Sequence, residues 1–198
     1  MEIKRIVTGP LATNTYLLSE NKEALLIDPD GKAEKLIGQL NDLKLIGILL
    51  THGHFDHIKA VDGLYEKFRC PVYLNPEDEQ LARDKHSGED FGLVSYLTCP
   101  LHDLKEGRMT IGPFVFDVFF TPGHTKGSVI FVFPEGIFSG DTLFRRSIGR
   151  TDLPGGDMRQ LNQSLQLFRQ FDRDYDIYPG HDQPTRLSEE LLYNYFLN

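Results

Sequence analysis

Short apolar runs alternate along the chain with stretches in which apolar residues recur at helical spacing. Residues 24–28 (ALLID) and 45–50 (LIGILL) are too short for typical helices and rich in Leu and Ile, which predicts strands, the second one buried on both faces. Residues 33–43 carry Leu36 and Leu40 on one face and predict an amphipathic helix. The same reasoning predicts the other elements of the first half: strands at 3–7, 15–18 and 71–74, and helices at 58–67 and from Pro76 to about Arg83.

The second half opens with apolar runs separated by Gly and Pro and closes with helical patterns. Residues 84–102 show no clear period and predict a long surface loop, placed to cover a functional site. Both halves run from strands to helix without an internal repeat or a linker, so we expect one α/β domain over residues 1–198. The elements predicted here are strands at 109–111, 114–120, 128–133, 136–139 and 175–178, and helices at 157–169 and 188–197, the last with Ser188 as its N-cap.

Composition and charge exclude several classes of partner. The formal net charge of −8 argues against binding to nucleic acid or to an anionic membrane. No apolar run approaches the roughly 20 residues that span a bilayer, and the N-terminus lacks the apolar core of a signal peptide, so we expect a cytoplasmic protein. Cys70 and Cys99 lie far apart in no CxxC spacing, which favours two reduced thiols over a disulfide.

The segment His52-Gly53-His54-Phe55-Asp56-His57 is the most informative part of the sequence. It directly follows the buried strand predicted at 45–50, at the end of the strand where open α/β sheets place their ligands. In an extended segment residues 52, 54 and 56 point to one side, while His57 turns away as the next helix begins. Imidazole and carboxylate are donors that zinc, manganese and iron prefer. The segment therefore predicts a metal site, since chance would rarely place three of only seven histidines within six residues.

Three more metal-capable side chains follow predicted strands in the same way. His124 comes after Pro122-Gly123, Asp141 after Ser139-Gly140, and His181 after Pro179-Gly180. One such residue alone is more often an ordinary surface or core residue, but three of them beside the HxHxDH segment predict a shared site. His86 and His102 lie in or next to the unpatterned loop and are expected to be ordinary surface residues.

These motifs occur in the order found in the metallo-β-lactamase fold superfamily, which the chain resembles from TNTYLL and LLIDPD to PGHD. The resemblance implies a four-layer αββα sandwich, in which two mixed sheets are flanked by helices and the metal site lies at one edge. Asp28 matches an Asp with a structural role in that family, and a turn or helix cap explains it equally well. The implied metal ligands are His52, His54 and His124 for a first ion, Asp56, His57 and His181 for a second, and Asp141 as a bridge.

Two bound divalent ions would supply a nucleophile without a Ser or Cys. They lower the pKa of a bound water from 15.7 to roughly 7, and ions about 3.5–4 Å apart can share one hydroxide. The sequence has no GxSxG elbow that would indicate a serine hydrolase. Asp56 and Asp141 are the expected catalytic carboxylates. Zinc is the expected ion, with iron and manganese as alternatives that the same donors accept.

The segment after Asp141, GDTLF…GRTDLPGGD, resembles that of short single-domain glyoxalase II-like hydrolases. These are similar to hydroxyacylglutathione hydrolase, which cleaves the thioester S-lactoylglutathione, so the resemblance implies a small-molecule thioester substrate. Arg150 is a candidate anchor for a substrate carboxylate. A salt bridge to Asp152 or Asp157 explains Arg150 equally well. Asp152 also stands where that family has Tyr, and the family's basic C-terminal helical region is missing, which argues against glutathione recognition.

Two other functions remain as alternatives. Iron-dependent persulfide dioxygenases of the same superfamily share much of the ligand set and the GRTD segment. Here, however, Ser147-Ile148 precedes Gly149-Arg150 where that group has Gly-Cys, so we favour thioester hydrolysis. A non-enzymatic metal-binding protein would close its site with a further protein ligand, whereas seven ligands across two ions leave room for substrate. The sequence does not indicate an oligomeric state.

Overall fold

The first half of the chain forms a six-stranded mixed sheet. The structure is a computed structural model that describes residues 1–198. The strands pair in the order β1–β2–β3–β4–β5–β6, antiparallel from β1 to β3 and parallel from β3 to β6. Their bounds are Glu2–Thr8 (β1), Thr13–Glu20 (β2), Glu23–Ile27 (β3), Lys44–Leu49 (β4), Val72–Leu74 (β5) and His102–Asp103 (β6).

The second half forms another six-stranded mixed sheet, in the order β14–β13–β10–β9–β8–β7. All its pairs are antiparallel except β10 with β13, so β8, β10 and β13 run in the same direction. A separate hairpin, β11 with β12, follows β10. The bounds are Gly107–Ile111 (β7), Phe114–Phe120 (β8), Val129–Phe133 (β9), Gly136–Gly140 (β10), Leu143–Phe144 (β11), Ser147–Ile148 (β12), Asp176–Pro179 (β13) and Thr185–Arg186 (β14).

The two sheets pack face to face around an aromatic core. In β3, Leu25 and Ile27 face this core, while Ala24 and Leu26 face the opposite side of the sheet, because side chains alternate along a strand. In β9 the same alternation sends Phe131 into the core and Ile130 outward. Both faces of each sheet are therefore apolar, and each outer face needs a cover of its own.

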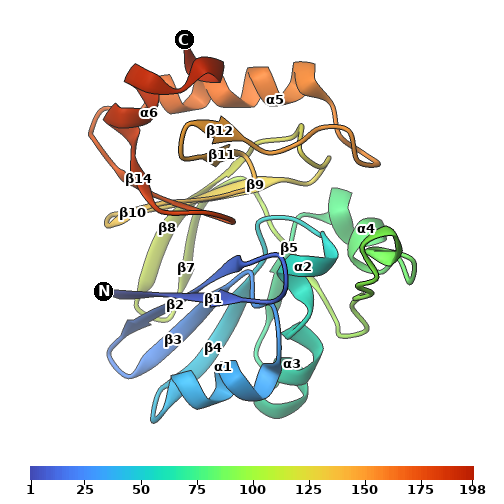
Figure 1. Cartoon of the computed structure of the whole chain (residues 1–198). Helices are drawn as coiled ribbons and strands as arrows, with labels where there is room; N and C mark the ends of the chain where they lie inside the picture. The colour runs from blue at the N-terminus through green and yellow to red at the C-terminus, as the bar shows by residue number, and fades with distance from the viewer.

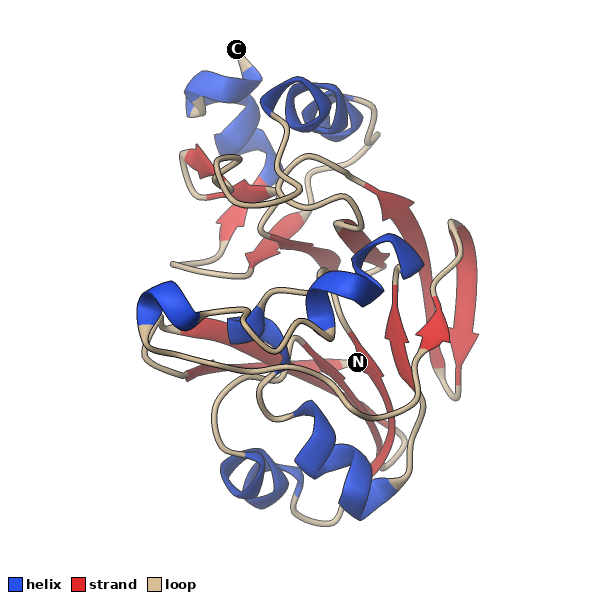
Figure 2. Cartoon of the chain, turned by 90° about the vertical axis from the view of Figure 1, so that its right-hand side faces the viewer, coloured by secondary structure: helices blue, strands red, loops and turns tan.

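Helices cover the outer faces (Figures 1 and 2). Leu36 and Leu40 of α1 and Leu64 of α3 join the cluster outside the first sheet, and Leu161 of α5 and Leu187 of α6 join the one outside the second. The resulting αββα order confirms the predicted fold class. None of the helices is both long and apolar enough to cross a membrane. The helices are α1 (Ala33–Leu40), α2 (Phe55–Ile58), α3 (Val61–Phe68), α4 (Glu79–Ala82), α5 (Met158–Leu165) and α6 (Leu187–Tyr193), with 3₁₀ turns at Pro76–Asp78, Glu89–Phe91, Gln166–Arg169 and Tyr195–Leu197.

Several predicted boundaries are wrong. The helix expected at 58–67 is α3, which begins only at Val61, and Ile58 ends the separate short helix α2. The closing helix ends at Tyr193, where Asn194 leaves the helical conformation, and a 3₁₀ turn follows. Ser188 is not its N-cap: it lies inside α6 and bonds to Asp174 instead. The expected loop at 84–102 is irregular apart from one 3₁₀ turn and the start of β6.

Candidate metal centre

The predicted site residues meet because four strands end at one edge of the sandwich. His52 follows β4 of the first sheet, and His124, Asp141 and His181 follow β8, β10 and β13 of the second. The last three strands run in the same direction, so their carboxyl ends share an edge. Backbone bonds connect the strand ends across the sandwich, from Val129 N to Thr51 O at 2.8 Å and from Asn14 N to Gly180 O at 2.7 Å. The fold thereby fixes the distances between the loops that carry the site.

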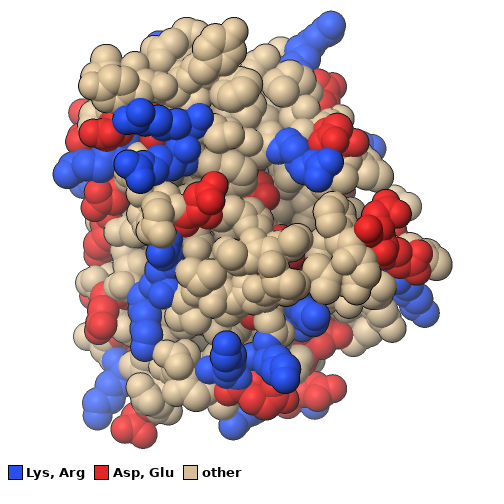
Figure 3. Space-filling view, in the orientation of Figure 1, with Lys and Arg blue, Asp and Glu red and all other residues tan.

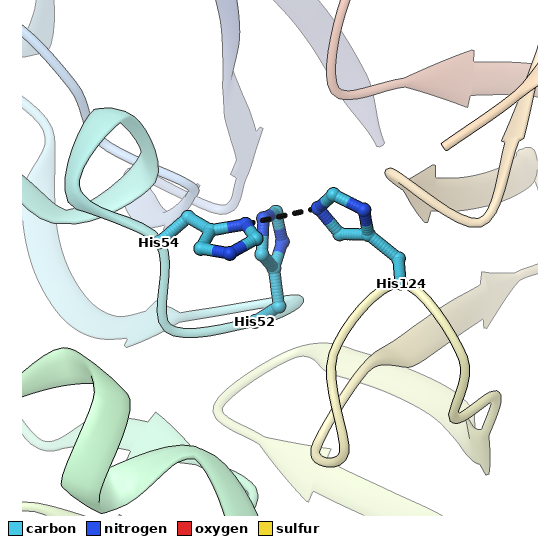
Figure 4. A group of neighbouring side chains, drawn as sticks. All are labelled: His52, His54 and His124. Carbon is cyan, nitrogen blue, oxygen red and sulfur yellow. Dashed lines mark hydrogen bonds between the residues drawn. The ribbon is translucent and has the colours of Figure 1, made fainter. Parts of the chain in front are cut away.

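Three histidines form the first group (Figure 4). His52 and His54 come from the loop after β4, and His124 faces them from the loop after β8. Nδ1 of His54 lies 2.9 Å from Nε2 of His124. One nitrogen atom of each ring lies within 4.8 Å of the others, and all three side chains are buried. Three convergent imidazole nitrogens are a ligand set typical of catalytic zinc.

Asp56, His57 and His181 form a second group next to the first. Nε2 of His181 lies 3.3 Å from Oδ2 of Asp56 and 3.3 Å from Nε2 of His57. Asp56 and His57 belong to α2, whereas His181 arrives from the far end of the chain after β13. A carboxylate and two imidazoles suit zinc, iron or manganese.

Asp141 lies between the two groups. Its Oδ2 is 3.4 Å from Nε2 of His124 in the first group and 3.6 Å from Nε2 of His181 in the second. Its Oδ1 is 3.5 Å from Nε2 of His57. A single carboxylate therefore reaches ligand nitrogens of both groups, as a residue that bridges two ions would.

The structure corrects how the segment 52–57 presents its side chains. Extended backbone through residue 56 would direct His57 away from the site. Instead α2 begins at Phe55, directly after His54, and places both Asp56 and His57 in its first turn. The side-chain period changes there from two to 3.6, so both residues enter the site. The fully buried His57 ring lies 4.1 Å from that of His52, measured between ring centroids.

Two buried atoms at the centre of this cluster have no hydrogen-bond partner: Nε2 of His52 and Oδ1 of Asp141. A buried polar atom without a partner costs about 1–3 kcal/mol. A cation held among these residues would satisfy both atoms. Nitrogen and carboxylate oxygen are also the donors that zinc, iron and manganese accept. The residues present therefore fit divalent metal ions.

Three of the candidate ligand histidines have a partner at Nδ1 that orients the ring. Nδ1 of His124 lies 2.7 Å from the carbonyl oxygen of Arg150, and Nδ1 of His181 lies 3.2 Å from that of Leu11. Nδ1 of His52 lies 3.0 Å from the hydroxyl of Thr51. When Nδ1 donates to such a partner, Nε2 is left unprotonated and faces the centre, which is the arrangement that ligand histidines need.

Asp28 supports the second group in this way. One carboxylate oxygen accepts the backbone N–H of Thr51 at 2.8 Å. The other accepts the hydroxyl of Thr51 at 2.6 Å and lies 3.0 Å from Nδ1 of His57. Asp28 is buried and has a positive φ of 48°. Asp28 therefore supports the candidate ligand His57 and does not cap a helix.

Asp78 is a supporting residue that the sequence did not reveal. Its carboxylate accepts the backbone N–H of Gly53 at 2.9 Å, the hydroxyl of Thr125 at 2.6 Å and the backbone N–H of Gly127 at 2.7 Å. These partners lie in the two loops that carry His52, His54 and His124, so Asp78 holds the loops together. In the sequence, Asp78 comes shortly after Asn75-Pro76, in the first turn of a helix. Acidic residues are common there because they interact favourably with the helix dipole, so the sequence gives no sign of a second role.

Burial keeps the imidazoles of His52 and His54 neutral. It lowers the pKa of His54 to about 3 and that of His52 well below 6.5, and neutral imidazole is the form that binds a metal. The second group differs. Burial alone would lower the pKa of His57, but three neighbouring carboxylates, led by Asp141, outweigh it and raise the pKa to about 10. His57 would therefore have to lose a proton in order to hold a metal ion in the second group.

Residues 8–181 match the metallo-beta-lactamase superfamily, and this span includes every candidate ligand. The chain belongs to the metallo-β-lactamase superfamily. Two relatives match it along almost their entire lengths. It is 36% identical over 208 residues to "Probable metallo-hydrolase YqgX" of Bacillus subtilis, covering 100% of this chain and 98% of the relative. It is 34% identical over 210 residues to "Hydroxyacylglutathione hydrolase GloC" of Haemophilus influenzae, covering 100% and 99%.

Solved structures of the superfamily share the whole fold. BLEG-1 B3 metallo-beta-lactamase has a TM-score of 0.93 at 40% identity, with complete coverage of both chains. TTHA1623 in a di-iron-bound form has a TM-score of 0.91 at 40% identity, covering 98% of this chain and 100% of its own. ETHE1 from Myxococcus xanthus has a TM-score of 0.80 at 30% identity, covering 98% and 84%. Membership of this superfamily and the His/Asp groups together imply that the chain is a metallo-hydrolase that binds divalent metal ions.

A cavity of about 450 Å³ opens onto the site and reaches Asp56, His124 and Asp141. Arg150 also lines it, but its guanidinium is engaged with Asp152 through two contacts of 2.7 Å each. The salt bridge considered for Arg150 is therefore present, and its partner is Asp152 and not Asp157. His86 and His102 are exposed, as expected, and Cys70 and Cys99 are buried free thiols.

Proposed function

We propose that this metallo-hydrolase is a thioesterase that cleaves S-lactoylglutathione or a related acylglutathione. The observation that carries the proposal is the pair of three-residue groups joined by one carboxylate, Asp141, at the floor of an open cavity. The full-length similarity to hydroxyacylglutathione hydrolase GloC supports a thioester as the bond that is cleaved. Two unpaired thiols fit a reducing compartment, so we also propose that the enzyme acts in the cytoplasm.

Each of the two groups would hold one divalent ion, and zinc is the ion we propose first. Bound there, the ions would supply a hydroxide at neutral pH and an acid for the substrate carbonyl oxygen. Asp56 accepts the hydroxyl of Thr13 at 3.2 Å, and its carboxylate faces His181. The neighbouring imidazoles, His57 first, lower the pKa of Asp56 despite its burial, so it is ionised at neutral pH. A thiolate leaves without strong acid assistance, so the chain needs no separate proton donor for the leaving group.

Arg150 is the proposed anchor for a substrate carboxylate. Its side chain is 51% exposed and that of Asp152 is 67% exposed, so the ion pair between them is largely hydrated. Such pairs contribute little to stability, and a substrate carboxylate can replace Asp152 at small cost. Removing the side chain in Arg150→Ala should raise KM while kcat changes little.

A second candidate function is iron-dependent persulfide oxidation. The similarity to ETHE1 gives it some support, and di-iron TTHA1623 shows that a relative of this fold accepts iron. The chain is less similar to ETHE1 than to GloC, both in sequence identity and in the share of the relative that is covered. Thioester hydrolysis therefore stays the first proposal. A purely metal-binding role has less support, because the cavity leaves the groups accessible to a substrate.

The proposal is tested by turnover of S-lactoylglutathione by purified protein of known metal content, with oxygen uptake on glutathione persulfide measured in parallel. Hydrolysis without oxygen uptake is expected. His54→Ala and Asp141→Asn should lose metal and turnover together while the circular dichroism spectrum is unchanged. Oxygen uptake with one iron per chain and no hydrolysis would replace the proposal with the dioxygenase. Unchanged turnover in either variant would refute the assigned site.

A further inference from the structure

One part of the wall of the cavity over the metal centre is apolar. Fourteen residues line it, and six of them are hydrophobic. Besides the candidate metal ligands, its polar lining consists of Ser147, Arg150 and Asp182, and Arg150 is already paired with Asp152. Around the hollow on this face, Figure 3 shows mainly uncharged surface, with most charged groups at its margins. The hydrophobic members are Leu11, Phe55, Phe91, Phe144, Ile148 and Leu153.

Phe91 is the most exposed aromatic side chain of this wall. It ends the 3₁₀ turn Glu89–Phe91 and is 44% exposed. Its ring lies 5.6 Å from that of Phe55, tilted by 31°. Phe55 is the first residue of α2 and precedes the candidate ligand Asp56. Phe91 therefore extends an apolar surface outward from the metal centre.

The backbone around Phe91 is held in place. Gly88 and Gly92 flank the turn with φ values of 92° and 65°, which side chains rarely adopt. A Cβ on Gly88 would collide with the carbonyl oxygen of Leu93 and stand 2.7 Å from the ring of Phe55. Only glycine lets the loop pack this closely against Phe55. The position of Phe91 at the cavity mouth is thus set by the loop that carries it.

We infer that this cavity selects thioesters with an apolar acyl group, and that Phe91 is the residue that sets this specificity. The inference rests on the proposed thioesterase function and names its substrate class. Methylene groups placed against Phe55 and Phe91 leave water and gain contact. Full burial of one methylene improves binding about fourfold, and a half-exposed wall should give about two- to threefold. The hydroxyl of a lactoyl group gains nothing from such a wall, so longer saturated acyl groups should be better substrates.

The first arm of the test measures binding without turnover. Metal-free protein is titrated by calorimetry with S-methyl-, S-butyl- and S-hexylglutathione, and Kd should fall about two- to threefold per added methylene. Phe91→Ala should flatten this dependence. Val94→Ala is the matched control, because Val94 lies in the same loop, is 47% exposed and does not line the cavity. If Kd falls with alkyl chain length as steeply in Phe91→Ala as in Val94→Ala and the wild type, the role of Phe91 is overturned.

The second arm measures kcat/KM of the metal-loaded enzyme for acetyl, butyryl and hexanoyl thioesters of glutathione. A rise with chain length that is lost in Phe91→Ala and kept in Val94→Ala supports the inference. Hydrolysis of all three at equal efficiency would overturn the inference while the thioesterase function stands. No hydrolysis of any thioester would overturn both, and the binding arm would then show whether the apolar wall serves another ligand.

Discussion

Replacing Asp28 by Asn should weaken the second metal site without unfolding the protein. Asp28 supports the second group through His57, because one of its oxygens lies 3.0 Å from Nδ1 of that residue. With the carboxylate present, His57 donates from Nδ1 and offers Nε2 to the metal. An amide of the same shape cannot accept from His57 and from both donor groups of Thr51, which Asp28 satisfies at 2.8 Å and 2.6 Å. If the amide nitrogen faces His57, His57 loses its partner or changes tautomer and protonates Nε2. If the amide oxygen faces His57, the negative charge beside the ring is still lost, and the backbone N–H of Thr51 loses its acceptor.

The size of the effect follows from the bond that is lost. A hydrogen bond to a charged group contributes about 1.5–3 kcal/mol, and a tenfold change in affinity corresponds to about 1.4 kcal/mol. Asp28→Asn should therefore lower the affinity of the second site about 10- to 100-fold, the range found when partners of ligand histidines are removed. The first group keeps the carbonyl of Arg150 as a support for His124, while the Thr51 hydroxyl that meets His52 is itself bonded to Asp28, so the affinity of the first site should fall by less than that of the second.

Competition against a chromophoric chelator measures both affinities in one titration. Asp30→Asn is the matched control: Asp30 lies two residues away, is also buried, and neither of its carboxylate oxygens has a hydrogen-bond partner. Burial raises the pKa of Asp30, so this variant should keep both metal affinities and be at least as stable as the wild type. Two unchanged affinities in Asp28→Asn, or an equal loss in Asp30→Asn, would refute the role assigned to Asp28.

Three further predictions follow from single contacts. Burial raises the pKa of Cys70 to about 11 and that of Cys99 to about 12, so neither thiol should react with a thiol reagent at pH 8 until the protein is unfolded; fast labelling of the native protein would contradict this. In metal-free protein the carboxylates around His57, led by Asp141, raise its pKa to about 10 despite its burial, from about 6.5 in an unfolded chain. The contribution of His57 to stability is therefore complete below pH 6.5 and is lost as the pH rises towards 10. Urea midpoints measured with chelator present should therefore fall between pH 7 and 9, and a flat or rising profile would oppose this. Gly180→Ala should reduce bound metal, because the new Cβ would collide with Oδ1 of Asp141 and stand 2.8 Å from Cε1 of His57; a full metal content by elemental analysis would count against it.

The layered architecture could be predicted because its cause lies in the sequence pattern. Runs such as LIGILL at 45–50 and VIFVF at 129–133 are apolar at every position or nearly so, and only strands buried on both faces need that. The gathering of the site residues could also be predicted, because His124, Asp141 and His181 each follow a strand. Strand direction then brings these residues to one edge.

Other features depend on tertiary contacts that leave no local pattern. The sequence does not show that the extended segment ends before Asp56. The helix α2, which begins at Phe55, is what turns His57 towards the site. Asp78 resembles any acidic residue at a helix start until the fold brings Gly53 and Gly127 to it. The two-residue strands β6, β11, β12 and β14 are too short to show a period, so none of them was predicted.

We propose that seven residues build one centre for two metal ions, and a stoichiometric titration of metal-free protein tests this proposal most directly. Zinc is added in steps while bound metal and thioester hydrolysis are measured on the same samples. We predict binding that saturates at two ions per chain, with hydrolysis rising to its maximum as the second ion binds. Saturation at one ion per chain, or full activity before the second ion binds, would contradict the account. The residues concerned are His52, His54, Asp56, His57, His124, Asp141 and His181.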